Sequence, residues 1–437
     1  THEDLSPYSC QSAQAGNEAL ISLELLEDRG WLEPDRGPEV GEPPRAYRRR
    51  RLNDAYRRFA ADPAPGESQG LREFADKHAH WLEDYALFRV VKQLYKGLPW
   101  QRWPADLRDR NPGALDRIRR DNAALMEQVR FEQYLFFSQW RALRRYANDS
   151  GVLIFGDMPL FVATDSADVW AHRECFRLGA DGEPEVVAGV PPDYFSDTGQ
   201  RWGNPHYDWA HLEATGFDWW MQRFGSQLEL FDLLRIDHFR GLEACWEIPA
   251  DEPTAINGQW VKAPGEALLG ALRERFARLP LVAEDLGVIT PEVEALRDHF
   301  GFPGMRILQF AFDGGPDNPY LPHNYVPNAV VYTGTHDNNT TMGWYAELEA
   351  GTRQRLLEYL GCAPDGMPAA LCRAAFASVA QLAMVPMQDL LRLGSEQRMN
   401  TPGTQNDRNW RWRFAWEQVS TGVAVQYRRG LELYGRV

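Results

Sequence analysis

Short apolar runs alternate with amphipathic segments along the chain after Gly151. Runs of this kind predict buried strands, and intervals with apolar residues three and four positions apart predict helices. The predicted strands cover 152–155, 230–236, 279–283, 306–312, 329–332 and 382–386, and the clearest helices cover 265–278, 290–299 and 352–360. Strands that alternate with helices in this way favour a parallel sheet in an α/β fold.

The repeated strand and helix units favour a closed barrel over an open sheet. An open doubly wound sheet is expected to carry a glycine-rich phosphate turn after an early strand, and the sequence has no such motif. We therefore predict a (β/α)8 TIM barrel with long active-site loops over residues 1–437. Residues 46–148 have few strand-type runs and long helical patterns, notably over 123–146, which predicts a mainly helical insertion within the barrel.

Residues 179–207 read as one long irregular loop. The segment is too long for an ordinary connection and is rich in Pro, Gly, Trp and Tyr, which is typical of a loop that carries function. Tyr194, Phe195 and Trp202 lie in it outside any periodic face, where their rings are expected to stack on sugars. For most other aromatic residues a core position is predicted, as for Trp81, Trp140, Trp219 and Trp220.

Composition and charge narrow the possible partners. The formal net charge of -15 disfavours nucleic acid as a partner, because polyanions are repelled. No apolar run approaches the roughly 18 residues of a membrane span, and the N-terminus lacks the order of a signal peptide. The five cysteines are widely spaced and have no metal-type spacing. We therefore expect a cytoplasmic protein without a membrane partner.

Carboxylates follow three of the predicted strands. Asp237 comes directly after one strand, Glu284 and Asp285 follow the next, and Asp337 follows a third after a Thr-Gly-Thr turn and His336. The loops at the carboxyl ends of parallel strands build the active site of such a fold, so these acids are expected to converge. Converging carboxylates indicate acid/base or nucleophilic chemistry at a sugar.

The neighbours of Asp237 and Glu284 predict different protonation states for the two acids. Arg235 lies two residues before Asp237, so both side chains face the same way, and the guanidinium would keep Asp237 ionised as a nucleophile. The alternative is a purely structural ion pair. Glu284 follows four apolar residues, which favours its protonated form and suits a general acid. Spacing alone does not separate Glu284 from Asp285.

A metal site is the competing interpretation of these acids. His238 and His336 lie near them in the sequence, but no H-E-x-x-H or comparable ligand spacing is present. We therefore predict chemistry without metal or organic cofactor, with His336 and Asp337 hydrogen-bonded to sugar hydroxyls.

Longer motifs resemble one known family, the 4-α-glucanotransferases called amylomaltases or disproportionating enzymes, glycoside hydrolase family 77. The resemblance covers nearly the whole chain, and the order of the motifs agrees. The motifs are Ser6 to Tyr8 with Ala15 to Asn17, Asp165 to Trp170, Val187 to Ser196, Gly199 to Pro205, Arg235 to Gly241, Ala283 to Gly287, Gly334 to Asn338, Val385 to Asp389 and Met399 to Gly403.

The resemblance implies a retaining enzyme that transfers α-1,4-glucan segments between maltooligosaccharides. It implies Asp237 as nucleophile, Glu284 rather than Asp285 as acid/base, and Asp337 as stabiliser of the transition state. The substrate-binding residues that it implies are Arg235, His336, Asp193, Gln200, Trp202, Asn400, Tyr194, Phe195 and Tyr8. Maltooligosaccharides and glucans derived from starch or glycogen are the implied partners.

Two departures from the family pattern affect the prediction. Family members place a barrel strand just before the Ser-Pro-Tyr segment, so the first strand is expected to be missing from a chain that starts at Thr1. Glu18 stands where the family usually has Pro, which leaves contacts near Tyr8 less secure. The alternative functions are an α-1,4-glucan hydrolase and a catalytically silent glucan-binding protein.

Overall fold

The computed structural model describes residues 5–35, 37–62, 65–192 and 196–437. Six parallel strands form its centre, in two sheets ordered β1-β4-β7 and β10-β9-β8. The Ala283 N–H donates to the Pro303 carbonyl oxygen at 2.9 Å and so joins the two sheets between β7 and β8. The strands are β1 (Phe155–Pro159), β4 (Leu233–Asp237), β7 (Leu281–Ala283), β8 (Gly304–Ile307), β9 (Ala329–Tyr332) and β10 (Leu382–Met384).

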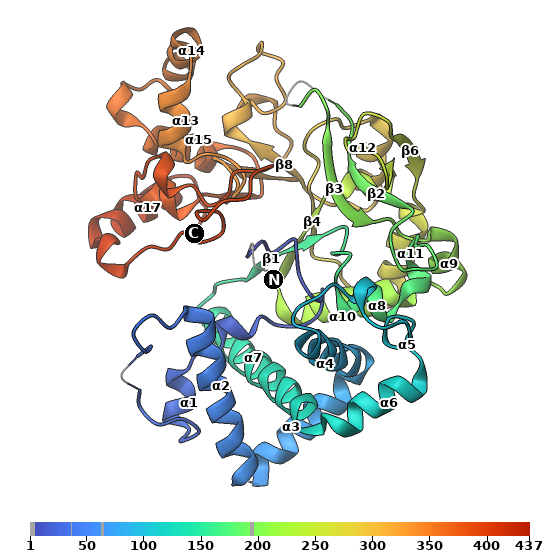
Figure 1. Cartoon of the computed structure of the whole chain (residues 1–437). Coiled ribbons are helices and arrows are strands. Elements are labelled where there is room, and N and C mark those ends of the chain that lie inside the picture. The colour runs from blue at the N-terminus through green and yellow to red at the C-terminus, as the bar shows by residue number, and fades with distance from the viewer. Residues whose placement is uncertain (1–4, 36, 63–64, 193–195) are drawn as a thin grey trace.

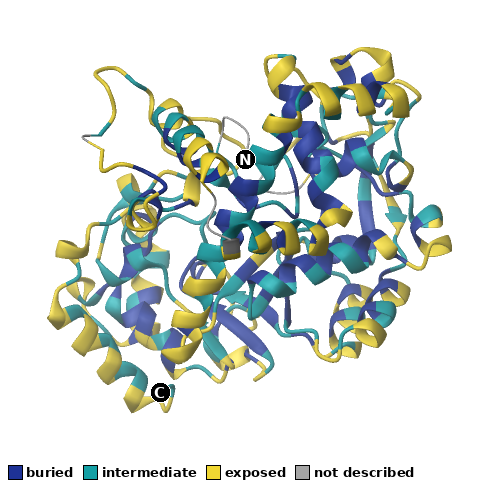
Figure 2. Ribbon diagram, turned by 90° about the horizontal axis from the view of Figure 1, so that it is seen from below, coloured by how far each residue is buried: buried dark blue, intermediate teal, exposed yellow. Residues whose placement is uncertain are grey.

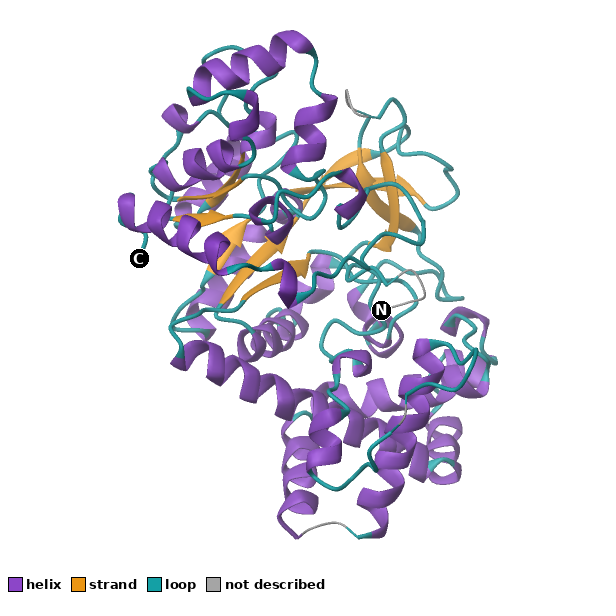
Figure 3. Ribbon diagram, turned by 90° about the vertical axis from the view of Figure 1, so that its left-hand side faces the viewer, coloured by secondary structure: helices purple, strands orange, loops and turns teal. Residues whose placement is uncertain are grey.

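Helices surround these strands, as Figure 3 shows. A mixed α/β fold is thus confirmed, and α-helices separate the parallel strands along the chain except between β8 and β9, where the structure has two short 3-10 turns. Among the described strands β1 pairs only with β4 and β10 only with β9, so the array of described strands has two open edges. The helices after β1 are α8 (Ala167–Ala171), α9 (Trp209–Ala214), α10 (Asp218–Leu230), α11 (Gly265–Arg275), α12 (Pro291–His299), α13 (Thr341–Glu347), α14 (Ala350–Leu360), α15 (Ala369–Ala377), α16 (Met387–Leu390) and α17 (Thr421–Leu433).

The described residues before β1 include no strand, and the helices that precede β1 form the lower lobe in Figure 1. Its longest helix is α7, whose apolar residues Met126, Phe131 and Leu135 are buried against the neighbouring helices. Phe131 and Leu135 lie four residues apart, which puts them on one face of the helix. The helices of this lobe are α1 (Glu24–Asp28), α2 (Pro44–Ala61), α3 (Pro65–Lys77), α4 (Ala79–Leu94), α5 (Ala105–Arg108), α6 (Pro112–Asp121) and α7 (Ala123–Asp149).

The segment 179–207, predicted to be irregular, contains two strands, so that prediction was wrong in part. β2 (Val186–Val190) and β3 (Gln200–Pro205) pair with β5 (Ala244–Pro249) and β6 (Gln259–Lys262) in an antiparallel sheet ordered β3-β2-β5-β6. Gly189 interrupts the alternation of side chains that marks a strand in the sequence. It is required there because a Cβ would lie 2.1 Å from the Gln200 carbonyl oxygen.

The buried residues lie mainly on the strands and on parts of the helices, as the dark blue ribbon in Figure 2 shows. Val282, Met305, Ile307 and Val330 form one apolar cluster across β7, β8 and β9. Trp81, Trp219 and Trp220 are buried as predicted, and Trp140 is partly buried. Within the described residues, no helix combines the length and the apolar character that crossing a bilayer requires.

Candidate active site

Acidic residues gather where the parallel strands end. In the pairing of β1 with β4, Asp157 lies opposite Arg235 and Pro159 lies opposite Asp237. In the pairing of β4 with β7, Ile236 lies opposite Ala283, so Asp237 and Glu284 are the next residues along two neighbouring strands. The expected convergence of strand-end acids is therefore found for these two residues.

Arg235 binds two of the carboxylates. Its guanidinium lies 2.9 Å from an Asp237 oxygen and 2.7 Å from Asp157. Arg235 is itself buried, so little water screens its ion pairs with the two carboxylates. The predicted common face of Arg235 and Asp237 is confirmed.

Glu284 and Asp285 point to different surroundings. Glu284 accepts hydrogen bonds from the backbone N–H groups of His238 at 2.7 Å and Leu286 at 2.8 Å. His238 has φ 55° and ψ 47°, a left-handed conformation, where it donates to Glu284 from the turn after β4. Asp285 instead pairs with Arg297 and accepts the Met305 N–H. Of the two acids that spacing could not separate, Glu284 is the one beside Asp237.

The structural role of Asp285 leads to a stability prediction. Asp285→Ala leaves the Arg297 guanidinium without its buried partner, and loss of one member of a buried pair costs about 3–5 kcal/mol of the free energy of unfolding. The matched control is Asp298→Ala, because Asp298 also pairs with Arg297 but is 61% exposed, and the expected cost is below about 1 kcal/mol. Denaturant unfolding of both variants measures the difference, and equal costs would contradict the assignment.

Asp337 is fixed by the segment that follows β10. The Asn400 side-chain amide donates to an Asp337 carboxylate oxygen at 2.6 Å, and the Arg398 guanidinium donates to its carbonyl oxygen. Asn400 is buried. The predicted site residues Asp337 and Asn400 are thus in direct contact.

Tyr8 links His336 to the strand-end acids. Its hydroxyl donates to Asp157 at 2.8 Å and lies 2.8 Å from His336 Nε2. Burial, followed by the negative charge of Asp157, raises the pKa of Tyr8, so the hydroxyl keeps its proton. The Tyr8 hydroxyl therefore bridges Asp157 and His336 Nε2. The hydrogen-bonded chain runs from His336 through Tyr8 and Asp157 to Arg235.

Two residues of this cluster were missed in the sequence. Asp157 lies within β1, two residues before the end of the strand, and contacts both Arg235 and Tyr8. Trp410 packs its ring 5.4 Å from the His336 ring and 5.8 Å from the Tyr8 ring, measured between centroids. No local signal at Trp410 points to residues so distant in sequence.

The protonation of Asp237 differs from the sequence-based prediction. Burial raises the pKa of Asp237, and the charges of Asp157, Glu284 and Asp337 raise it further, while Arg235 lowers it. The net direction is upward, so Arg235 does not by itself keep this acid ionised. Burial also raises the pKa of Glu284 against the effects of Arg235 and of the two N–H donors, in the predicted direction.

The remaining predicted binding residues lie farther along the site or outside the residues that the structure describes. The Trp202 ring stands edge-on to the His238 ring at 4.8 Å, and its indole N–H donates to Gln200 at 3.2 Å. Trp202 therefore reaches the acids through His238, whose N–H binds Glu284. Asp193, Tyr194 and Phe195 lie outside the described residues.

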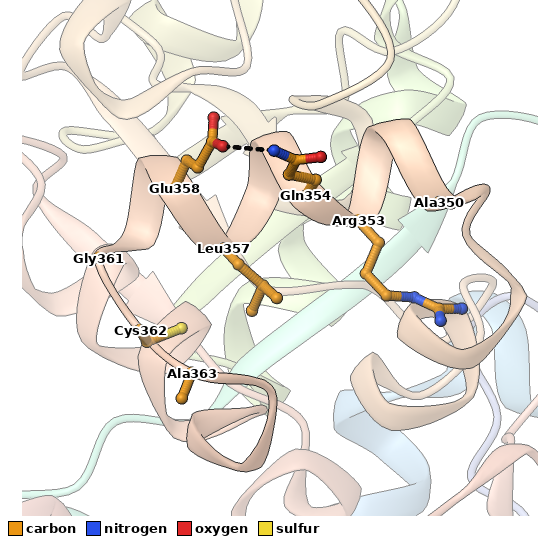
Figure 4. A pocket seen from close by; sticks show the side chains of 8 residues that line it. All are labelled: Ala350, Arg353, Gln354, Leu357, Glu358, Gly361, Cys362 and Ala363. Carbon is orange, nitrogen blue, oxygen red and sulfur yellow. Dashed lines mark hydrogen bonds between the residues drawn. The ribbon is translucent and has the colours of Figure 1, made fainter.

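Two hollows lie apart from the acid cluster. One, of about 540 Å³, is formed by α14 and the turn after it, and Figure 4 shows its lining with the hydrogen bond of 2.8 Å from Gln354 to Glu358. The other, of about 840 Å³, lies between the start of α4, α10 and α11. Over the residues that the structure describes, no group of three His, Cys, Asp or Glu side chains is arranged to hold a metal ion.

The chain is similar to known proteins of one family. A sequence model of the family described as 4-alpha-glucanotransferase matches residues 1–419. The chain belongs to the 4-alpha-glucanotransferase family. The predicted family is thereby confirmed, and so is the prediction that the chain is an enzyme of this type.

Relatives in the 4-alpha-glucanotransferase family are similar over nearly the whole chain. The 4-alpha-glucanotransferase of Thermus thermophilus is 52% identical, over 99% of this chain and 89% of the relative. That of Synechocystis sp. is 48% identical, over 99% and 88%. The solved structure of an amylomaltase from Streptococcus agalactiae in complex with acarbose matches with a TM-score of 0.94 at 36% identity, over 99% of this chain and 89% of that one.

Proposed function

We propose that the chain transfers α-1,4-glucan segments between maltooligosaccharides by a retaining double displacement, with Asp237 as nucleophile and Glu284 as acid/base. The observation that carries these roles is the strand register at the site. Asp237 and Glu284 follow paired residues on β4 and β7, and neighbouring strands are about 4.8 Å apart. Retention requires two carboxyl groups about 5 Å apart, which this register supports.

In the first step Glu284 gives its proton to the glycosidic oxygen while the Asp237 carboxylate attacks the anomeric carbon. The leaving segment departs with the proton, and the donor segment is held as an ester on Asp237. In the second step Glu284, now a base, takes the proton of an acceptor 4-hydroxyl, whose oxygen attacks the anomeric carbon, displaces the Asp237 carboxylate and restores the α-1,4 bond. Acceptor binding in a cleft that excludes water would favour transfer over hydrolysis.

The raised pKa values of both acids fit one shared proton. When two buried carboxyl groups lie together, one remains protonated near neutral pH and the pair titrates as a unit. Arg235 forms its ion pair with Asp237, which favours the negative charge there and the proton on Glu284. This is the distribution of charge that the first step needs.

This electrostatic arrangement predicts a shift in the pH profile. Because Asp237 must be ionised and its pKa is raised, the acid limb of kcat/KM is expected well above the usual range of an aspartate. Asp157→Asn removes a negative charge that raises this pKa, so the acid limb should move to lower pH. The profile of kcat/KM on maltotriose measures the shift, and an unchanged or higher limb would contradict it.

The other site residues are proposed to bind the glucan around the two acids. Asp337 would stabilise the distorted sugar at the reacting position, with Arg235, His336, Tyr8 and Asn400 beside it. Gln200 and Trp202 would contact sugars on the side of β3. Asp193, Tyr194 and Phe195, which lie outside the described residues, are also proposed to bind the glucan. The acarbose bound to the Streptococcus agalactiae amylomaltase supports a glucan-like ligand.

The domain organisation and the location are also part of the proposal. We propose that residues 1–437 form one catalytic (β/α)8 barrel, to which the six parallel strands belong. Residues 46–148 would be its helical insertion. The proposed substrates are maltooligosaccharides and glucans derived from starch or glycogen, without metal or organic cofactor. A cytoplasmic location is proposed because the five cysteines are widely spaced, as is usual in reducing compartments.

Incubation with maltotriose tests this function. Transfer yields glucose together with maltotetraose and longer products, because each cleaved segment is passed to another sugar. Glucose and maltose without longer products would instead identify an α-1,4-glucan hydrolase. Binding of maltotriose by calorimetry without any product would identify a glucan-binding protein that lacks catalysis.

A further inference from the structure

A row of aromatic side chains begins next to Trp410, whose ring packs against His336 and Tyr8 in the acid cluster. Trp412, Phe414 and Trp416 follow at every second position. The Trp412 and Phe414 ring centroids are 6.0 Å apart, and those of Phe414 and Trp416 are 5.1 Å apart. These three residues are called the aromatic row, and it continues directly from the site.

The aromatic row is fixed at its inner end and open at its outer end. The Trp412 indole N–H donates to the Gln397 side chain at 2.8 Å, and the Trp410 backbone N–H donates to the Met399 carbonyl oxygen at 2.8 Å. At the outer end Trp416 is 76% exposed. Large apolar rings that remain together in water mark a binding surface rather than a core.

The backbone that carries Trp416 is also held in place. Trp416 begins a short 3-10 turn, Trp416–Gln418, and the Gln418 side chain accepts the Ala415 N–H at 2.7 Å. The helix α17 starts shortly afterwards at Thr421, capped by Ser420. The exposed ring therefore stands on an ordered support, which lowers the entropy lost when a ligand binds to it.

We propose that the aromatic row is a second glucan-binding surface, which holds the part of a long α-1,4-glucan that extends beyond the acid cluster. This inference rests on the proposed function. Sugar rings stack their apolar faces on aromatic planes. Six residues of extended chain join Trp410 in the acid cluster to Trp416 and reach at most about 20 Å, so the surface from Trp410 through the aromatic row can serve several consecutive glucose units. A short oligosaccharide held at the acids would not reach its outer end.

A neutral ligand suits this surface better than a polyanion. Arg411 and Arg413 alternate with the aromatic residues, a mixture that also occurs where single-stranded nucleic acid stacks. The net charge of -15 opposes the approach of a polyanion, whereas a glucan carries no charge. The row is also continuous with a site built for sugars, which favours the glucan.

The experiment compares Trp416→Ala with the wild type on amylose and on maltotriose. KM for amylose is expected to rise roughly 3- to 10-fold, the size of one lost exposed stacking contact. The kcat on amylose and both constants on maltotriose should be unchanged, and Trp416→Phe should restore most of the lost affinity. The matched control is Tyr146→Ala, because Tyr146 on α7 is another aromatic residue, 73% exposed, outside the row.

The failure of this inference is distinct from that of the proposed function. Failure of the wild type to elongate maltotriose would overturn the proposed function, whatever Trp416 does. Equal KM for amylose in the wild type and Trp416→Ala would overturn the inference while transfer persists. Light scattering measures the oligomeric state of the wild type and of Trp416→Ala. If the wild type is a dimer that the substitution dissociates, and KM for amylose is unchanged, the aromatic row is a contact between two copies and the inference is overturned.

Discussion

Asp237→Asn is expected to abolish transfer, with kcat on maltotriose lower by about 10⁴-fold or more. An amide does not attack the anomeric carbon, so no ester forms and both steps of the reaction are lost. The amide nearly matches the carboxylate in size and keeps a hydrogen-bonding oxygen toward Arg235, so the fold should persist. Steady-state kinetics on maltotriose, together with thermal unfolding, measures both effects.

The matched control is Asp251→Asn, because Asp251 is an exposed carboxylate after β5, apart from the acid cluster. Its kcat should equal that of the wild type. Asp157→Asn is an informative third variant, because Asp157 also forms an ion pair with Arg235 but is not proposed to form an ester with the sugar. A retained rate in Asp237→Asn would require another nucleophile.

Glu284→Gln is expected to lower kcat on maltotriose by about 10³-fold, the size of lost general acid/base assistance. The loss should depend on the leaving group. A maltosyl fluoride needs no proton to release fluoride, so its first step should proceed in the variant at a rate close to that of the wild type. Transfer to a sugar acceptor should remain slow, because no base activates the 4-hydroxyl.

The neighbouring acid provides the comparison for this variant. Asp285→Asn should reduce the stability of the fold, because it weakens the ion pair with Arg297. It should change the rates with maltosyl fluoride and with maltotriose by the same factor. A Glu284→Gln variant that is equally slow with both donors would contradict a proton-transfer role. It would then point to a loss of the contacts with the His238 and Leu286 N–H groups.

The parts of the fold that the sequence predicted well are those where local pattern and burial agree. Residues 329–332 form β9 at the predicted positions, because the run is short and three of its four residues are fully buried. Thr290 and Pro291 mark the start of α12 at the predicted residue. The residue pair Arg235 and Asp237 was found because alternation along a strand fixes their common face.

Elsewhere the same pattern failed for physical reasons. Leu230 was predicted to begin a strand but ends α10, because an apolar residue is buried equally well on either element. The strand predicted to end at Phe155 instead begins there. The prediction ended at Phe155 because Gly156 and Asp157 resemble a turn in the sequence. Gly156 is needed because a Cβ would lie 2.3 Å from the Phe231 ring. Asp157 was therefore overlooked.

Reasoning from the strand pattern could predict only those site residues that lie at the ends of strands. The contacts of Tyr8 with Asp157 and His336, and those of Trp410 with both rings, join segments from opposite ends of the chain. Tertiary structure alone brings them together. The protonation of Asp237 also depends on tertiary structure, because it is the sum of burial and of four charged neighbours.

Trapping of the ester tests the central claim most directly. Glu284→Gln is mixed with maltosyl fluoride, quenched in acid, digested and analysed by mass spectrometry. The account predicts a maltosyl adduct on the peptide that contains Asp237, located on that residue by fragmentation. An adduct on Asp337, or turnover of the fluoride with inverted configuration and no adduct, would contradict it.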